Sequence, residues 1–449
     1  MTTPAPSLTR QLARRLRNGL ITADDVHTAT YYTLDVLGSY IAGGVTPQGR
    51  KLIDYHRING LQGVESEVFL AAALSHITET DDLHRSSVTH PACVVIPAAL
   101  EMARHLELTG KMALEAIVVG YEAMIRVGDA LGDAHYRIFH NTATAGVFGS
   151  AAAAAYLLEL SEDQWVWALG NAGTQAAGLW QFNVDATMSK HLHAGHAAQA
   201  GVRAALLAIR GFTGPEQILE GEKGFFKALC PDARPDAVTA DATGWRIGET
   251  SVKPYPSCRH THPAIDVTLK LREELLAQGR TTDEVEHIRI RTYDTSQRVT
   301  DNPSPDTTFA AKFSIQYCVV TALRHGFPVL PDFEGDRLAA TARDPRVQRA
   351  EAISDAAFTG RYPVAWGSAV ELTLRSGEVL TGETFAASGD PEKPLDRDEL
   401  KAKIRGEFAY AGLDETAAGA QISAIEALPG AEVIPGFYWN GPAAVHPNF

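Results

Sequence analysis

The chain has 449 residues, of which 45% are hydrophobic and 21% are charged, and its formal net charge at pH 7 is −14. These proportions are ordinary for a globular protein, and the length suggests two or three domains. Because binding to nucleic acid requires clustered Lys and Arg, the negative charge argues against a nucleic-acid partner. A small anionic substrate is compatible with the charge, since a local pocket can be positive on an acidic protein.

The four cysteines are widely spaced and form no CxxC pair. This spacing favours neither a zinc site nor a disulfide framework, and it predicts reduced thiols. The first residues lack a basic segment followed by an apolar one, so no secretory signal is visible. The apolar runs fall short of the length and hydrophobicity of a membrane span. We therefore predict a cytoplasmic protein without a membrane partner.

From the first residue to about residue 250, the sequence predicts many helices and no strand. Ser7, Thr22 and Ser161 are N-cap candidates because each precedes an apolar helical segment. The segment 110–128 has apolar residues on nearly all sides, which predicts a helix buried at the centre of a helical bundle. The expected helices cover residues 8–16, 22–44, 110–128, 143–160, a segment that begins after Ser161, and 197–210.

The composition changes after residue 228, and the second region predicts both helices and strands. The expected elements are a helix over 264–278, a strand over 285–292, a helix over 313–324, a hairpin with arms 370–375 and 378–383, and helices from 400 onward. We therefore predict a mainly α protein. A large all-helical domain comes from both chain ends, residues 1–252 and 396–449, and a smaller α+β domain, residues 253–395, is inserted between them.

Four polar segments interrupt the apolar helices, at residues 79–91, 135–142, 187–196 and 253–262. The first segment holds three carboxylates, two histidines and an arginine. Each segment alone could be a solvated loop or a helix cap. Their recurrence predicts a site where the two domains meet.

Histidines, lysines, tyrosine and carboxylates without zinc spacing suit proton transfer on an anionic substrate. Lysine and protonated histidine bind carboxylates, while a neutral histidine, a tyrosine or an aspartate exchanges the proton. Two pairs of histidines are two positions apart in the chain, His191 with His193 and His260 with His262. Residues at this spacing do not share a face of a helix, so neither pair is well placed on a helix to bind one metal ion. No HExxH, GxSxG or GxGxxG pattern is present. We predict neither a metal nor a cofactor.

Seven groups of motif residues occur in order along nearly the whole chain. They are Asp81-Asp82 with Thr89-His90-Pro91, Gly120 to Glu122 with Arg126, Phe139-His140 with Thr142 and Gly146, Ser189 to Gly195, Gly211 to Pro215, Lys253 to Cys258, and Lys312 to Tyr317. In these motifs the chain resembles the MmgE/PrpD family. That family includes 2-methylcitrate dehydratase, cis-aconitate decarboxylase and iminodisuccinate epimerase.

The resemblance implies a homodimer whose active site needs no cofactor. The family's site positions fall on His90, His140, Lys190, Lys253 and Tyr317. A carboxylate from Glu79, Asp81 or Asp82 completes the catalytic set. We expect His140 or His90 to transfer the proton together with Tyr317. The residues expected to bind the substrate carboxylates are Lys190, Lys253, Arg85, His193 and His262.

The chain departs from the decarboxylase pattern at three positions. Glu79 replaces an aspartate, Leu83 a threonine and Cys258 a histidine. Our leading hypothesis is a cofactor-independent lyase that removes a proton α to a carboxylate and expels water from a 2-methylcitrate-like acid. The alternatives are an epimerase of an iminodisuccinate-like dicarboxylate, a cis-aconitate-type decarboxylase, and a non-catalytic carboxylate-binding protein. The sequence leaves open which acid is bound and which residue is the base.

Overall fold

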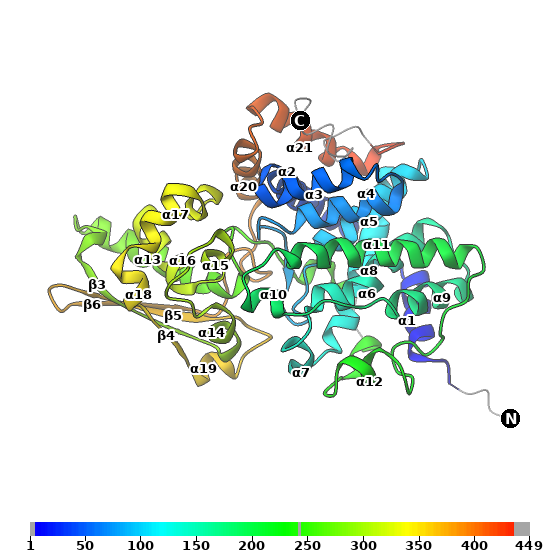
Figure 1. The fold of residues 1–449 in the computed structure, drawn as a ribbon, viewed down its shortest axis with the longest axis horizontal. Helices are drawn as coiled ribbons and strands as arrows, with labels where there is room; N and C mark the ends of the chain where they lie inside the picture. Colours follow the sequence, from blue (N-terminus) through cyan, green and yellow to red (C-terminus); the bar gives the residue numbers. More distant parts are fainter. Residues whose placement is uncertain (1–4, 241–243, 435–449) are drawn as a thin grey trace. The chain divides into compact units, whose positions relative to one another are not determined.

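The computed structural model describes residues 5–240 and 244–434 (Figure 1). The chain divides into two compact units. Unit 1 comprises Met1–Ile77, Asp81–Thr250 and Glu407–Phe449, and unit 2 comprises Thr78–Thr80 and Ser251–Gly406. The predicted mainly α fold is confirmed, because helices dominate and the strands are few and short. Along the chain, unit 1 passes into unit 2 after residue 250 and unit 2 passes back into unit 1 after residue 406, which lies within a helix.

The helices of unit 1 follow from local signals in the sequence. They are α1 (Leu8–Asn18), α2 (Ala23–Val45), α3 (Pro47–Ile58), α4 (Val64–Ser75), α5 (Ala92–His105), α6 (Gly110–Asp129), α7 (Asp133–Tyr136), α8 (Asn141–Leu157), α9 (Glu162–Gly173), α10 (Gln181–Val184), α11 (Ser189–Ile209), α12 (Phe225–Leu229) and α21 (Glu415–Glu426). The predicted caps are confirmed. Ser7 accepts a hydrogen bond from the backbone of α1, and Thr22 and Ser161 form capping boxes at the starts of α2 and α9.

Two predictions for this region are wrong. The first is the absence of strands, because the chain forms β1 (Leu83–His84) and β2 (Thr250–Ser251). Each has two residues, too few for an alternating pattern to be visible in the sequence. The second concerns the third polar segment, which we expected to precede a helix that starts at residue 197. Instead α11 begins at Ser189, because Lys190, Ala194 and Ala197 share a buried helical face.

The core of unit 1 is built from small residues. Helix α8 packs against α5, α6 and α11, and Figure 1 shows α11 running beside α8. A Cβ atom at Gly201 of α11 would overlap the Ser150 side chain and the Val147 carbonyl of α8. At Gly146 a Cβ atom would lie 3.1 Å from the Ala197 side chain. Glycine therefore allows these two helix backbones to approach closely.

Unit 2 contains a four-stranded sheet in the order β4-β3-β5-β6. Its strands are β3 (Val285–Thr292), β4 (Glu351–Ser354), β5 (Ser368–Leu374) and β6 (Val379–Thr384). Strand β3 pairs parallel with β4 and antiparallel with β5, and β5 pairs antiparallel with β6. The strand over 285–292 and the hairpin were predicted. Strand β4 was missed because only one of its four residues is buried, which leaves no alternating pattern.

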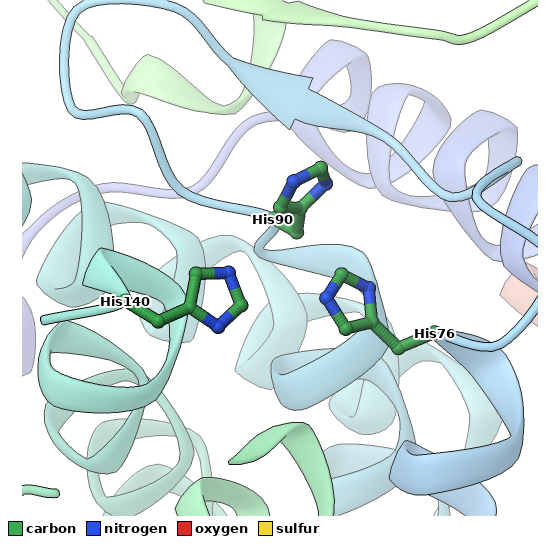
Figure 2. Close-up of side chains that lie close together, drawn as sticks. All are labelled: His76, His90 and His140. Carbon is green, nitrogen blue, oxygen red and sulfur yellow. The ribbon is translucent and has the colours of Figure 1, made fainter. Parts of the chain in front are cut away.

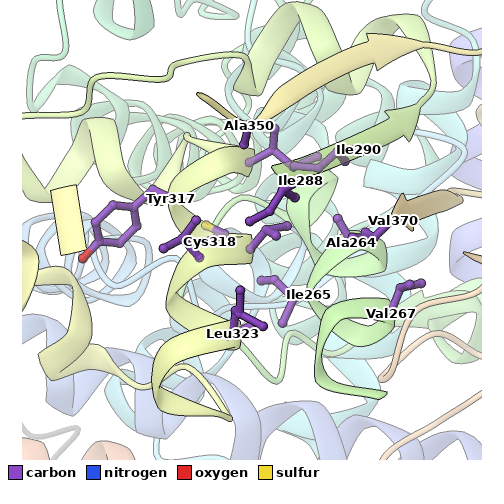
Figure 3. Packing of buried hydrophobic residues seen from close by; sticks show 14 of the residues in the cluster. Ala264, Ile265, Val267, Ile288, Ile290, Tyr317, Cys318, Leu323, Ala350 and Val370 are labelled. Carbon is purple, nitrogen blue, oxygen red and sulfur yellow. The ribbon is translucent and has the colours of Figure 1, made fainter. Parts of the chain in front are cut away.

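The helices of unit 2 cover the sheet and surround its core. They are α13 (His262–Ala277), α14 (Asp294–Thr300), α15 (Thr308–Lys312), α16 (Ile315–His325), α17 (Gly335–Ala342), α18 (Pro345–Arg349), α19 (Ala356–Thr359) and α20 (Arg397–Tyr410), which crosses the division at residue 406. Figure 3 shows Ile288, Ile290 and Val370 of the sheet packed with Ile265 of α13 and Leu323 of α16. Among the described residues, no helix combines the length and apolar composition needed to cross a membrane.

Candidate active site

A buried histidine-carboxylate pair lies directly after helix α4. His76 caps the C-terminal end of this helix, and Asp81 follows five residues later. The Nδ1–H of His76 donates a hydrogen bond of 2.6 Å to Oδ2 of Asp81, and both side chains are 0% exposed. An ionised carboxylate only accepts hydrogen bonds, so Asp81 fixes the ring's orientation and places the proton on Nδ1.

Asp82 supports the start of helix α5. Its Oδ1 accepts a hydrogen bond of 2.9 Å from the backbone N–H of Ala92, and its Oδ2 accepts one of 2.8 Å from the Tyr121 hydroxyl. Burial raises the pKa of Asp82 well above its usual range. The Nδ1–H of His90 donates to the Asp82 carbonyl at 2.5 Å. Asp82 thus anchors α5 through its side chain and orients His90 through its backbone.

His140 faces His76 in unit 1. It precedes α8, and its ring lies within 15° of parallel to that of His76, with centroids 5.7 Å apart (Figure 2). Its Nδ1 is 3.4 Å from Nδ1 of His193, and the Trp180 ring packs against it with centroids 5.2 Å apart. Burial, assisted by the neighbouring His193, His76 and Lys190, lowers the pKa of His140 well below its usual range. Its imidazole is therefore neutral at pH 7.

His193 and Lys190 lie one turn apart on α11. Burial lowers the pKa of His193 to about 4, and the nearby His76 and Lys190 add to this effect. Lys190 is 2% exposed. We use the name histidine cluster for His76, His90, His140 and His193. Together with Lys190 and Asp81, this cluster combines neutral proton acceptors with a buried cation.

Two further residues, Arg85 and Cys93, flank His90 in the chain. Arg85 is buried in the loop between β1 and α5, where its carbonyl accepts a hydrogen bond of 3.3 Å from Val88. The Cys93 thiol donates to the His90 carbonyl at 3.3 Å, and burial raises its pKa well above the usual range. Cys93 is therefore a protonated core thiol rather than an activated nucleophile.

In unit 2, three lysines bind three consecutive carbonyl groups. The ammonium of Lys312 donates to the carbonyl of Thr78 at 2.7 Å, and that of Lys403 donates to the carbonyl of Thr80 at 2.7 Å. Between them, Lys253 donates to the carbonyl of Glu79 at 3.3 Å and to its carboxylate at 3.2 Å. We call this arrangement the lysine clamp. It holds Glu79 in a backbone conformation with a φ of 60°.

Both ring nitrogens of His262 are engaged within unit 2. Its Nδ1 accepts a hydrogen bond of 2.9 Å from Arg259, and its Nε2–H donates to the carbonyl of Ser257 at 3.2 Å. Burial and the charges of Arg259 and Lys253 lower the pKa of His262 well below its usual range. His262 is therefore a neutral residue that supports Arg259.

Tyr317 lies in the apolar core of unit 2, where Figure 3 shows it beside Cys318. Its hydroxyl donates a hydrogen bond of 2.6 Å to the Asp332 carbonyl, and its ring packs against Phe333. Burial raises its pKa above the usual range. To transfer a proton, this hydroxyl would first have to leave the Asp332 carbonyl.

Models of two protein domains match the chain almost from end to end. The MmgE/PrpD N-terminal domain matches residues 11–237, and the MmgE/PrpD C-terminal domain matches residues 255–428. The chain belongs to the MmgE/PrpD family. The resemblance inferred from the sequence motifs is thus confirmed.

Relatives within the family have modest identity to this chain. Mouse cis-aconitate decarboxylase is 27% identical over 75% of this chain and 70% of its own length. The cis-aconitate decarboxylase-like protein oryM of Aspergillus oryzae is 26% identical over 90% of this chain and 91% of its own length. The mitochondrial 2-methylcitrate dehydratase of Yarrowia lipolytica is 28% identical over 60% of this chain and 53% of its own length.

In this MmgE/PrpD chain, unit 1 brings together His90, His140, Lys190 and His193 from three predicted polar segments. Asp81 and Asp82 join this group, whereas Glu79, Lys253, His262 and Tyr317 belong to unit 2. Sequence reasoning missed His76. The signal that could have found it is a histidine at the end of an apolar helix, three residues before the first polar segment.

Two overlapping sets of side chains could hold a metal ion. His76, His90 and His140 each offer a nitrogen within 4.8 Å of the others, and His76, Asp81 and Cys93 form a second such set. Histidine and cysteine are ligands that suit Zn²⁺. However, the Nδ1 atoms of His76 and His90 already donate hydrogen bonds. Each of these rings could therefore bind a metal ion only through Nε2. The cysteine is a poor ligand while it stays protonated.

A cavity of about 570 Å³ lies beside α1, lined by Arg14, Arg15 and Trp245 among others. Its arginines are already paired, Arg14 with Glu162 and Arg15 with Glu122. None of the predicted site residues lines it. The chemistry of the chain therefore points to the histidine cluster rather than to this cavity.

Proposed function

We propose that this protein is a lyase that removes a proton α to a carboxylate of a small di- or tricarboxylic acid. The observation that carries the proposal is the buried group of neutral imidazoles around Lys190. Because the pKa values of His140 and His193 are lowered, both are in the proton-accepting form at pH 7. Lys190 supplies a buried positive charge that attracts an anionic substrate.

The chemistry of dehydration fits these groups. A proton bound to a carbon beside a carboxylate is weakly acidic, so its removal requires stabilisation of the negative charge that develops on the carboxylate. A cation held in a buried site provides this stabilisation, because Coulomb interactions are stronger where water is excluded. A protonated imidazole can then give its proton to the departing β-hydroxyl group, which leaves as water.

The substrate we propose is a 2-methylcitrate-like tricarboxylate. Relatives named 2-methylcitrate dehydratase support a hydro-lyase. The departures from the decarboxylase pattern at Glu79, Leu83 and Cys258 weigh against a decarboxylase. A cis-aconitate-type decarboxylase is the second candidate, because relatives with this name match a larger share of the chain. An epimerase would share the first step, the removal of the α proton. A non-catalytic carboxylate-binding protein would need only the positively charged side chains that bind the carboxylates.

Proton NMR in D2O tests the proposal. The purified, metal-stripped protein is incubated with 2-methylcitrate, citrate, cis-aconitate or a chiral aminodicarboxylate, and both deuterium uptake and new products are followed. A new olefin would establish a dehydratase, loss of CO2 a decarboxylase, and exchange with inversion an epimerase. Silence on every acid, including exchange, would contradict the lyase and favour the binding protein.

We also propose that the protein is a cytoplasmic homodimer. The four cysteines are all buried and no two of them form a disulfide, which fits a reducing compartment. Sedimentation equilibrium would test the dimer through a mass of twice 48.3 kDa. A single species at the mass of one chain would contradict it.

A further inference from the structure

His76 has one engaged ring nitrogen and one that has no partner. Its Nδ1–H donates to Asp81 at 2.6 Å, while its Nε2 is buried and makes no hydrogen bond among the described residues. Buried polar atoms are almost always hydrogen-bonded, so an unpartnered nitrogen in a fully buried ring calls for an explanation. A ligand that the protein binds during its work would supply the missing partner.

The unpartnered nitrogen lies within the histidine cluster. Figure 2 shows the His76 ring nearly parallel to that of His140, with a nitrogen on the side that faces His140, while His90 lies to one side. The rings of His76 and His90 have centroids 4.9 Å apart. A molecule that reaches His140 would therefore also come within reach of Nε2 of His76.

The Asp81 carboxylate lies closer to His76 than to His90. Asp81 accepts the Nδ1–H of His76 at 2.6 Å, whereas His90 donates to a neutral carbonyl and lies 3.6 Å from the same carboxylate. The carboxylate fixes the tautomer in which Nε2 carries a lone pair. It also stabilises the imidazolium that forms when Nε2 takes a proton.

We propose that His76, oriented by Asp81, is the general base of the α-proton abstraction. This inference rests on the proposed function. The bond between the α carbon and hydrogen breaks, the proton moves to Nε2 of His76, and the electron pair passes into the carbon–carboxylate enolate. When the enolate expels the β-hydroxyl group, the same imidazolium returns the proton to it. Water leaves, and the neutral imidazole is restored without an external oxidant or reductant.

The test compares the variants H76N, H76Q, H76A and D81N with H27N, which changes an exposed histidine outside the site. The asparagine of H76N can still donate to Asp81 from near the Nδ1 position, but it lacks any group at Nε2. Deuterium exchange into the acid that the wild type turns over is measured by NMR. Binding of the same acid is measured by calorimetry, and folding is checked by circular dichroism.

We expect H76N to lower the exchange rate by about 10²–10⁴-fold, the usual contribution of a general base, with binding within a factor of three. H76Q should be equally slow, because its amide cannot take the proton, and D81N should be intermediate. In H76A, added imidazole should restore part of the exchange, which a purely structural role would not allow.

Three results would overturn the inference. The first is an exchange rate in folded H76N that equals that of the wild type. The second is a loss of acid binding in H76N that is as large as the loss of exchange. The third is that imidazole fails to restore exchange in folded H76A. If the wild type exchanges and H76N does too, only the role of His76 fails. If the wild type catalyses deuterium exchange into none of the tested acids, the proposed function fails, and the inference fails with it.

Discussion

The ammonium group of Lys253 lies 3.2 Å from the Glu79 carboxylate, and both side chains are buried in unit 2. We expected Lys253 to bind a substrate carboxylate. In the structure its charge is balanced by a carboxylate of the chain itself, in the middle of the lysine clamp. A substrate that uses Lys253 must therefore share it with Glu79 or displace Glu79.

The first prediction concerns this pair. Replacement E79Q should lower the unfolding free energy by about 2 kcal/mol, because a charged hydrogen bond becomes a neutral one beside a buried cation. Added citrate should raise the melting temperature of E79Q more than that of the wild type. The control E273Q changes an exposed glutamate of α13 and should match the wild type. Equal stabilisation of both proteins by citrate would contradict the idea that Glu79 competes with an anion.

The second prediction concerns pH. The pKa values of His140 and His193 are lowered in the folded protein, so in mild acid the unfolded chain binds more protons than the folded one. Stability should therefore fall as pH drops below about 6.5, by at most about 1.4 kcal/mol per pH unit for each group. For His193 the loss continues to about pH 4.

Urea unfolding between pH 7.5 and pH 4.5 measures this slope. In H140N and H193N the slope should be smaller than in the wild type, and in the double variant smaller still. H27N serves as the control, since its ring is exposed. A double variant with the wild-type slope would show that other groups control acid unfolding.

The third prediction separates the two neighbouring aspartates. D82A should lower the unfolding free energy by about 3 kcal/mol, because α5 loses its cap and the Tyr121 hydroxyl loses a buried partner. D82N keeps an acceptor for Ala92 and should retain most of the exchange activity. D81N should fold but exchange more slowly than the wild type, because His76 loses its carboxylate partner. Activity lost in D82N and kept in D81N would reverse the two roles.

The fourth prediction concerns Lys190. K190M keeps the apolar stem and removes the charge, so affinity for the acid should fall by about 10- to 100-fold. The pKa of His140 should rise, because the charge of Lys190 helps to lower it. Calorimetry measures the affinity, and NMR titration of the imidazole measures the pKa. K270M, at an exposed position of α13, is the matched control. An unchanged affinity would remove Lys190 from the binding role.

The fifth prediction tests the close approach of α8 and α11. G201A should lower the unfolding free energy by about 1–3 kcal/mol, because the new methyl group overlaps the Ser150 side chain and the Val147 carbonyl. G419A, in α21, meets no atom within 4 Å. It should stabilise the protein by up to about 1 kcal/mol through helix propensity. A stabilising G201A would contradict the packing of these helices.

Much of the fold could be predicted because its signals are local. Ser7, Thr22 and Ser161 begin helices by binding backbone groups only three residues away. Strand β3 has the predicted bounds because alternating side chains reflect its half-buried position. Strand β4 was not predictable, since it exists only because β3 lies beside it and supplies its hydrogen bonds.

The amino-acid sequence by itself determined the helices with their caps, the polar segments and the family to which the chain belongs. Only the tertiary structure decided how the polar residues are paired. Glu79 meets Lys253 across 174 positions of sequence, and the ring of His76 meets that of His140 because α4 and α8 belong to one core. Such pairs depend on the packing of helices that are distant in sequence, and no local pattern records that packing.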